Sequence, residues 1–249
     1  MVVDEAQDIS VPQLKFLAML ASSQPNALFF AGDLGQRIFR QPFSWAPLGV
    51  HIRGRSKTLR INYRTSHQIR RQADLLLDDE LTDVDGNTES RYGTISVFNG
   101  PEPTVMECNR PEEETGLVDQ WILGRVEEGV APHEIGVFVR SEAELDRGRA
   151  AIESANLRYK HFDTTSGRVS ISAMHLAKGL EFRAVVVMAC DDEVIPLQER
   201  VESIVDEADL EEVYDTERHL LYVACTRTKD HLLVTGVDPV SEFVDDLQM

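Results

Sequence analysis

The chain has 249 residues, of which 42% are hydrophobic, and its formal net charge at pH 7 is −18. This composition is normal for a globular protein with a hydrophobic core and excludes general disorder. The sequence has no apolar run of about 18 residues, and its N-terminus has no basic segment followed by an apolar one, which excludes a membrane span and a signal peptide and predicts a cytoplasmic protein.

The first fifty residues have the pattern of a parallel β-sheet unit. A short apolar strand, Val2 and Val3, runs into acidic residues and is followed by a helix from about residue 12 to residue 21. A second apolar strand over residues 27–31 stops at glycine and aspartate. Strand, helix, strand is the building unit of a parallel sheet. A connector rich in proline and glycine follows, which predicts a domain boundary near residues 50–57.

The remainder alternates between the two kinds of periodicity. Strands are predicted at residues 94–98, 135–139, 168–172, 184–189 and 231–235, and amphipathic helices near residues 66–78, 112–128, 142–155 and 207–227. This alternation predicts an α/β fold. Residues 78–92 and 190–212 are rich in acids and poor in apolar periodicity, so we expect exposed loops or mobile helices there.

Charge is unevenly distributed along the chain. Residues 1–71 carry ten Lys or Arg against four acids, a balance of +6, which leaves −24 for the rest. Such asymmetry predicts that one end faces an anion, either a nucleotide or a nucleic acid, while the acidic part is a solvated surface. An ordinary uneven surface is the alternative. The cysteines Cys108, Cys190 and Cys225 are odd in number and lack metal-ligand spacing, so we expect reduced, buried thiols.

Two polar segments follow the first two strands. Asp4 and Glu5 stand where an apolar strand ends, a position that in nucleotide hydrolases suits an aspartate that holds Mg²⁺ and an acid that orients the attacking water. An exposed turn is the bland alternative. Gln36 follows the second strand, where its amide is placed to sense a phosphate or a water. The order of the two segments strengthens both interpretations.

Five segments of the chain occur in the order of the motifs of one helicase family. They are residues 4–8 (DEAQD, motif II), 32–39 (GDLGQRIF, motif III), 59–64 (LRINYR, motif IV), 174–182 (MHLAKGLEF, motif V) and 217–227 (ERHLLYVACTR, motif VI). In these segments the chain resembles the C-terminal part of UvrD/Rep-like superfamily 1 DNA helicases. The resemblance implies a RecA-like P-loop NTPase-type parallel sheet with flanking helices. Residues 1–55 would be a C-terminal remnant of the first RecA-like domain, and residues 56–249 a complete second one.

The resemblance also implies a catalytic set for ATP and Mg²⁺. Asp4 would hold Mg²⁺, Glu5 would polarise the hydrolytic water, and Gln36 would link the γ-phosphate to the DNA site. Arg64 and Arg227 would contact the γ-phosphate from the second domain, so that catalysis requires the two domains to close. An arginine in this role can supply about 10³ to 10⁵ in rate.

Three further residues resemble nucleotide-binding positions of the family. Tyr63 would stack on the base, Glu181 would accept a hydrogen bond from the ribose, and Gly179 would keep the backbone close to it. Each of the motif residues also has a local alternative. Tyr63 could be core packing, Arg64 could pair with a nearby acid, and the segment at Lys178 and Gly179 could be a plain helix or turn end.

For single-stranded DNA, the resemblance indicates aromatic side chains that stack on bases and basic side chains near phosphates. Phe39, Phe43 and Trp45 lie in and just beyond motif III, and His175 and Lys178 resemble motif V residues that couple DNA contact to the nucleotide. The pattern departs from the family in two places. Gln41 stands where a tryptophan is frequent, so Trp45 either replaces it or packs in the domain joint, and Ala173 stands where threonine is usual.

The sequence contains no Gly-x-x-x-x-Gly-Lys-Ser/Thr pattern and no motif Ia. The phosphate-binding loop is therefore missing, and we expect a truncated chain, a fragmentary gene or one half of a split enzyme that does not hydrolyse ATP alone. About a hundred residues separate motifs IV and V, which leaves no room for the large helical insertion of the longest family members.

Three functions are compatible with this sequence. The first is part of an ATP-driven helicase or translocase on single-stranded DNA, which in this family moves 3′ to 5′. The second is a non-catalytic module, residues 57–240, that binds DNA or a protein. In the third, another chain supplies the phosphate-loop half and docks at the strands within residues 2–31.

Overall fold

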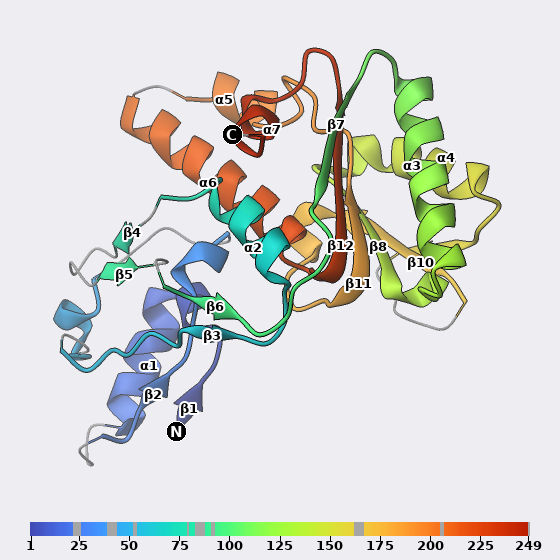
Figure 1. Cartoon of the computed structure of the whole chain (residues 1–249). Helices are drawn as coiled ribbons and strands as arrows, with labels where there is room; N and C mark the ends of the chain where they lie inside the picture. The colour runs from blue at the N-terminus through green and yellow to red at the C-terminus, as the bar shows by residue number, and fades with distance from the viewer. Residues whose placement is uncertain are drawn as a thin grey trace.

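The main feature of the computed structural model is a six-stranded, wholly parallel β-sheet with helices on both faces (Figure 1). The structure describes residues 1–21, 26–38, 44–51, 54–78, 80–82, 88–90, 93–161, 167–204 and 207–248. The predicted α/β class, with a parallel sheet and flanking helices, is confirmed.

The sheet has the strand order β7-β12-β11-β8-β10-β9. Its strands are β7 (Thr104–Cys108), β8 (Ile135–Val139), β9 (Tyr159–His161), β10 (Val169–Ala173), β11 (Phe182–Val187) and β12 (Thr228–Val237). Every residue of β8 and β10 is buried. Continuous apolar strands such as β8 are expected where a parallel sheet is covered on both faces.

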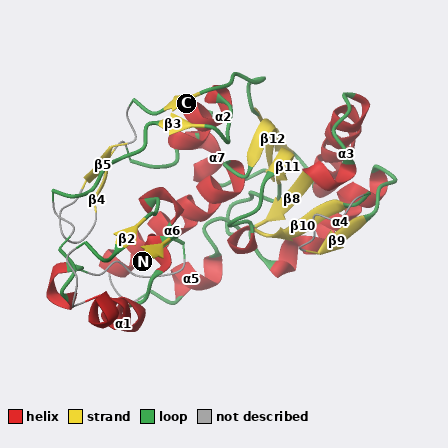
Figure 2. Ribbon diagram, turned by 90° about the horizontal axis from the view of Figure 1, so that it is seen from below, coloured by secondary structure: helices red, strands yellow, loops and turns green. Residues whose placement is uncertain are grey.

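Two layers of helices cover the sheet (Figure 2). On one face, α3 (Pro111–Glu127) and α4 (Leu145–Ser154) pack against it through a core that includes Val118, Ile122 and Ile152. On the other face lie α2 (His67–Asp74), α6 (Glu207–Cys225) and α7 (Glu242–Asp246). The short helix α5 (Gln198–Glu202) precedes α6. Helices therefore cover both faces of the sheet.

The N-terminal segment forms a small unit beside α6 (Figure 1). Strands β1 (Val2–Val3) and β2 (Phe29–Phe30) pair in parallel, and α1 (Val11–Ala21) connects them. Its hydrophobic cluster comprises the buried residues Ile9, Leu14 and Val50, with partly buried side chains such as Leu17 and Phe30 packed against them. A core of this size supports the unit only in combination with contacts to the rest of the molecule.

Two further strand pairs are separate from the main sheet. Strand β3 (Ile61–Asn62) pairs in parallel with β6 (Ile95–Ser96), and β4 (Glu80–Thr82) pairs antiparallel with β5 (Thr88–Ser90).

The structure corrects several sequence-based boundaries. Strands β3, β7 and β9 were not predicted, and residues 78–92, expected to be loop or mobile helix, include the β4–β5 pair. The expectation of an exposed segment over residues 190–212 is wrong in part, because Cys190 and Ile195 are fully buried. All three cysteines are free and buried, as predicted. In the described part of the chain, no helix combines the length and hydrophobicity needed to cross a membrane.

Candidate functional site

The loops that follow β1 and β2 are joined by one glutamine. Ala6 N donates to Ala31 O (2.8 Å), and Asp33 N donates to the side-chain Oε1 of Gln7 (3.1 Å). A Cβ atom at Gly32 would lie 2.5 Å from that Oε1, so a side chain there would displace the amide of Gln7. The ends of the two strands, with their acidic residues, are therefore held side by side.

Glu5 has an unusual backbone conformation. Its φ of 50° lies in the left-handed region, which costs a non-glycine residue on the order of 1–3 kcal/mol. The Glu5 N–H donates to Asp4 Oδ1 (2.9 Å), and its carboxylate accepts from Gln7 Nε2 (2.5 Å). The backbone and the side chain of the predicted water-activating residue are both fixed by neighbours.

The predicted metal ligand, Asp4, is exposed at the end of β1. Among the described residues, no group of three or more His, Cys, Asp or Glu side chains could hold a metal ion. Asp4 therefore fits Mg²⁺ only as one oxygen ligand beside phosphate oxygens and waters, which is how proteins often hold this ion.

Gln36 bridges the N-terminal unit and the segment after α6. Its Nε2 donates to Asp33 Oδ2 (2.9 Å), and its Oε1 accepts from Arg227 Nη2 (3.2 Å). One amide thus links residues that are 191 positions apart in the sequence.

Arg227 is a buried cation with neutral partners. Its side chain is among the largest fully buried ones, at 1% exposure. Besides Gln36, it donates to Val223 O (2.9 Å) and Thr226 Oγ1 (3.3 Å), and no carboxylate of the described residues forms an ion pair with it. Burial, reinforced by the nearby Arg64, lowers the pKa of Arg227 to about 10. A buried charge without a counterion is unfavourable, so this position favours an incoming anion.

Arg64 and Glu181 form a solvent-exposed ion pair, with Arg64 Nε 2.7 Å from Glu181 Oε1. Exposed pairs contribute little stability, so both side chains are available to a ligand. Tyr63 is 69% exposed, which rules out the alternative that it belongs to the core. The alternative for Arg64, pairing with a local acid, does occur in this structure.

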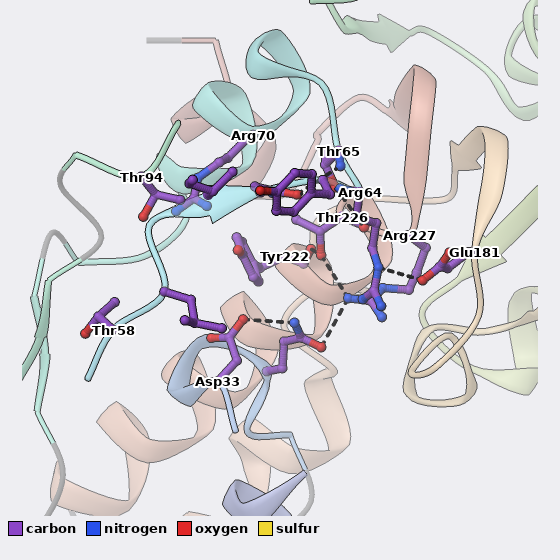
Figure 3. Close-up of a pocket in the computed structure, with 15 residues that line it drawn as sticks. Asp33, Thr58, Arg64, Thr65, Arg70, Thr94, Glu181, Tyr222, Thr226 and Arg227 are labelled. Carbon is purple, nitrogen blue, oxygen red and sulfur yellow. Dashed lines mark hydrogen bonds and ion pairs between the residues drawn. The ribbon is translucent and has the colours of Figure 1, made fainter. Parts of the chain in front are cut away.

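A cavity of about 590 Å³ connects these side chains, a size typical of small-molecule sites. Its lining includes Asp33, Gln36, Tyr63, Arg64, Thr65, Glu181, Tyr222, Thr226 and Arg227 (Figure 3). Five predicted nucleotide residues are thereby brought together, and Asp4, Glu5 and Gly179 lie outside the lining. The sequence analysis missed Asp33, Thr65, Tyr222 and Thr226, although all four lie within or next to the motif segments.

The predicted DNA residues have different outcomes. Phe39 and Phe43 lie outside the described residues. Trp45 is half-buried and packs edge-on against Phe30, with ring centroids 5.0 Å apart, which matches the packing alternative. His175 is half-buried after β10, and burial followed by the charge of Arg140 lowers its pKa. Their DNA roles stay predictions.

Lys178 lies against the acids of the N-terminal unit. Its Nζ is 2.6 Å from Asp8 Oδ2 and 3.4 Å from Glu5 Oε2, and it donates to Gln36 O (2.8 Å). The next residue, Gly179, has a φ of +81°, and a Cβ atom there would meet nothing within 4 Å. The backbone angle therefore favours glycine at this position.

Comparison with known proteins finds one family model that matches part of the chain. Residues 149–238 match the model of the UvrD-like helicase C-terminal domain. The chain is 24% identical over 241 residues to a "Probable DNA helicase" of Mycoplasma pneumoniae, which covers 94% of this chain and 43% of that protein. It is 45% identical over 69 residues to the "Putative ATP-dependent DNA helicase YjcD" of Bacillus subtilis, covering 27% of this chain and 9% of that protein.

The chain thus spans less than half the length of either relative. Among solved structures, the C-terminal domain of a "possible DNA helicase" from Lactobacillus plantarum aligns with a TM-score of 0.49 at 20% identity, over 75% of this chain and 94% of that one. The sequence comparisons are consistent with the helicase resemblance of the motifs.

Proposed function

We propose that the chain is part of an ATP-dependent DNA helicase or translocase and forms the side of its nucleotide site that contacts the γ-phosphate. The supporting observation is the guanidinium of Arg227, which is buried next to Arg64 and in contact with Gln36, and which forms no ion pair with a carboxylate of the described residues. In this proposal residues 1–55 belong to a first RecA-like domain and residues 56–249 to a second.

The arginines would act on the transferred phosphoryl group. Charge spreads over its oxygens in the transition state, and a fixed guanidinium stabilises that charge without reorganising at the moment of reaction. Arg227 is held by Val223 and Thr226 before any ligand binds, whereas Arg64 has to leave Glu181. Arg227 is therefore the preorganised group and Arg64 the mobile one.

Glu5 would activate the attacking water. Gln36, which is hydrogen-bonded to Arg227, would connect a change at the phosphate to the position of this arginine. When Mg²⁺ is bound with ATP, it neutralises charge on the phosphates, and Asp4 would hold it. Tyr63 presents an exposed aromatic face that is suited to stacking on a base. Glu181, once released by Arg64, would accept a hydrogen bond from the ribose.

The motif resemblance supports two further parts of the proposal: that the protein moves along single-stranded DNA, and that it moves in the 3′ to 5′ direction. The names of the two relatives, which include DNA helicase, support DNA as the partner. Hydrolysis further requires a phosphate-binding loop, and since the 249 residues contain none, it has to come from a segment or chain beyond them.

Equilibrium binding of a fluorescent ATP analogue, competed with ATP, adenosine and tripolyphosphate, tests the proposal on this chain. We expect ATP and tripolyphosphate to compete and Arg227→Met to weaken both by tenfold or more, because a charged hydrogen-bond partner is lost. Arg71→Met is the matched control, since its side chain is 62% exposed and pairs with Glu102. Competition by adenosine alone, or equal affinity of the Arg227 variant, would refute a phosphate role.

Turnover is tested by adding a phosphate-binding loop, as an N-terminal extension or as a second chain, with and without single-stranded DNA. We expect hydrolysis that DNA stimulates, and Glu5→Gln should abolish hydrolysis while ATP binding is retained. Absence of both binding and hydrolysis would favour the non-catalytic module instead.

A further inference from the structure

The side chain of Lys178 occupies a position that contact with DNA does not explain. It is 9% exposed and reaches from the loop after β10 into the N-terminal unit. We propose that Lys178 is a positioning residue that holds the loops carrying Glu5, Asp8 and Gln36, and that it does not bind a DNA phosphate. The inference rests on the proposed function only for the role of Glu5.

The contacts of Lys178 engage the whole ammonium group. A lysine ammonium has three N–H donors, and Nζ of Lys178 faces three acceptors: Asp8 Oδ2 (2.6 Å), Gln36 O (2.8 Å) and Glu5 Oε2 (3.4 Å). Lysine is almost never buried unless it is paired. To reach a phosphate, this side chain would have to give up contacts that it already makes at low solvent exposure.

Asp8 depends on the same contact. Its second oxygen, Oδ1, is buried and has no hydrogen-bond partner among the described residues, and Lys178 compensates the charge of this carboxylate. Removing one member of a partly buried pair leaves the other charge uncompensated, which costs more than the pair contributed. The loop from Glu5 to Asp8 is therefore expected to move when Lys178 is lost.

The contact with Gln36 extends the effect to the arginine. Lys178 binds the backbone carbonyl of Gln36, and the side chain of the same residue accepts from Arg227. One ammonium therefore sets the position of the acidic loop and of the glutamine loop relative to Arg227. The N-terminal unit has few other ways to fix this arrangement, because its own core is small.

Amide hydrogen exchange of the 249-residue chain tests the proposal without nucleotide. The reporters are the N–H groups of Ala6, Ala31 and Gln36, which are hydrogen-bonded to Ala31 O, Val3 O and Asp33 O. We expect Lys178→Met to accelerate their exchange at least tenfold relative to amides of β8, and Lys178→Arg to restore most of the protection. Because no ATP is present, failure of the nucleotide proposal would not affect the result.

Two further variants separate positioning from a general effect. Asp8→Asn should accelerate the same amides, and adding it to Lys178→Met should have less effect than Asp8→Asn has alone, because either change already removes the contact between Lys178 and Asp8. Lys15→Met removes an equal charge from the exposed face of α1 and should have no effect. Unchanged exchange in Lys178→Met, additive effects in the double variant, or an equal effect of Lys15→Met would each overturn the proposal.

The DNA alternative has its own signature. A lysine that contacts a phosphate contributes about one to the slope of log affinity for an oligonucleotide against log salt. We expect Lys178→Met to leave this slope unchanged. A slope reduced by about one, together with unchanged amide exchange, would assign Lys178 to DNA and refute positioning.

Discussion

Replacing Arg227 by methionine should separate the stability of the fold from its affinity for anions. The guanidinium is buried, and a pKa lowered to about 10 corresponds to a cost of roughly 3 kcal/mol for the charged form. Its hydrogen bonds to Val223 O, Thr226 Oγ1 and Gln36 Oε1 offset part of this cost. Replacement of buried ions by apolar side chains is often neutral or stabilising by 1–4 kcal/mol, and we expect a gain of about 1–3 kcal/mol for Arg227→Met.

The pH of the measurement follows from the sign of the shift. The folded-state pKa is depressed, so the folded protein releases the proton of Arg227 before the unfolded chain does. Below about pH 10 the residue is charged in both states and the full cost is present; it is relieved only as the pH rises through the folded-state value. Neutral pH therefore measures the whole effect.

Thermal unfolding at pH 7, with and without ATP, is the assay. For a chain of this size, 1–3 kcal/mol corresponds to an increase in Tm of roughly 2–10 °C. At the same ATP concentration, ATP should raise the Tm of the wild-type chain by more than that of Arg227→Met, since stabilisation by a ligand falls as its dissociation constant rises. Arg71→Met should behave as wild type in both respects. A Tm of Arg227→Met several degrees below wild type, or one that ATP raises as much as it raises that of wild type, would refute the reasoning.

Three other predictions concern the fold around the site. Glu217 is fully buried and pairs with Arg140, so Glu217→Gln should lower the free energy of unfolding by about 3–5 kcal/mol in denaturant titrations. Joint replacement of Glu217 and Arg140 by methionine should lower it much less, and equal losses in the two variants would contradict a charge effect. Burial raises the thiol pKa of Cys108 to about 11 and that of Cys225 to about 12. Neither thiol should therefore react with a thiol reagent at pH 8 until the chain unfolds, and rapid labelling of the native protein would contradict this prediction. Gly236→Ala would bring a Cβ atom within 2.5 Å of a backbone carbonyl oxygen and should destabilise by about 1–3 kcal/mol or more; an unchanged denaturation midpoint would disprove the close packing.

The sequence predicted the central elements of the fold because their residues are buried throughout. Residues 135–139 form an uninterrupted apolar run, and β8 has the same bounds as predicted. The edge strands β7 and β9 were missed because they carry exposed polar residues such as Glu107 and Lys160, and β9 has only three residues. Pairing with a neighbouring strand stabilises β7 and β9, and this pairing cannot be predicted from the local pattern of apolar residues.

The candidate site was predictable in its residue types and not in its contacts. Motif order identified Gln36, Arg64 and Arg227, which line one cavity. The pairing of Lys178 with Asp8 joins residues 170 positions apart, and that of Arg140 with Glu217 joins residues 77 positions apart. Spacing along the chain could not reveal either pair, because each depends on how β-strand ends and helices meet in space.

Substitutions that change the tilt of helix α6 can move Arg227, although they lie far from the cavity. Glu217, in its interior, is clamped by Arg140 and Arg200, and Arg227 lies two residues past its end. Ten residues of helix span about 15 Å, so a tilt of about 5° at the clamp would swing the guanidinium by roughly 1.3 Å. A displacement of this size can change a rate by about 10²-fold. Substitutions of Arg200, a partly exposed residue on α5, could therefore adjust turnover while every side chain that lines the cavity stays the same.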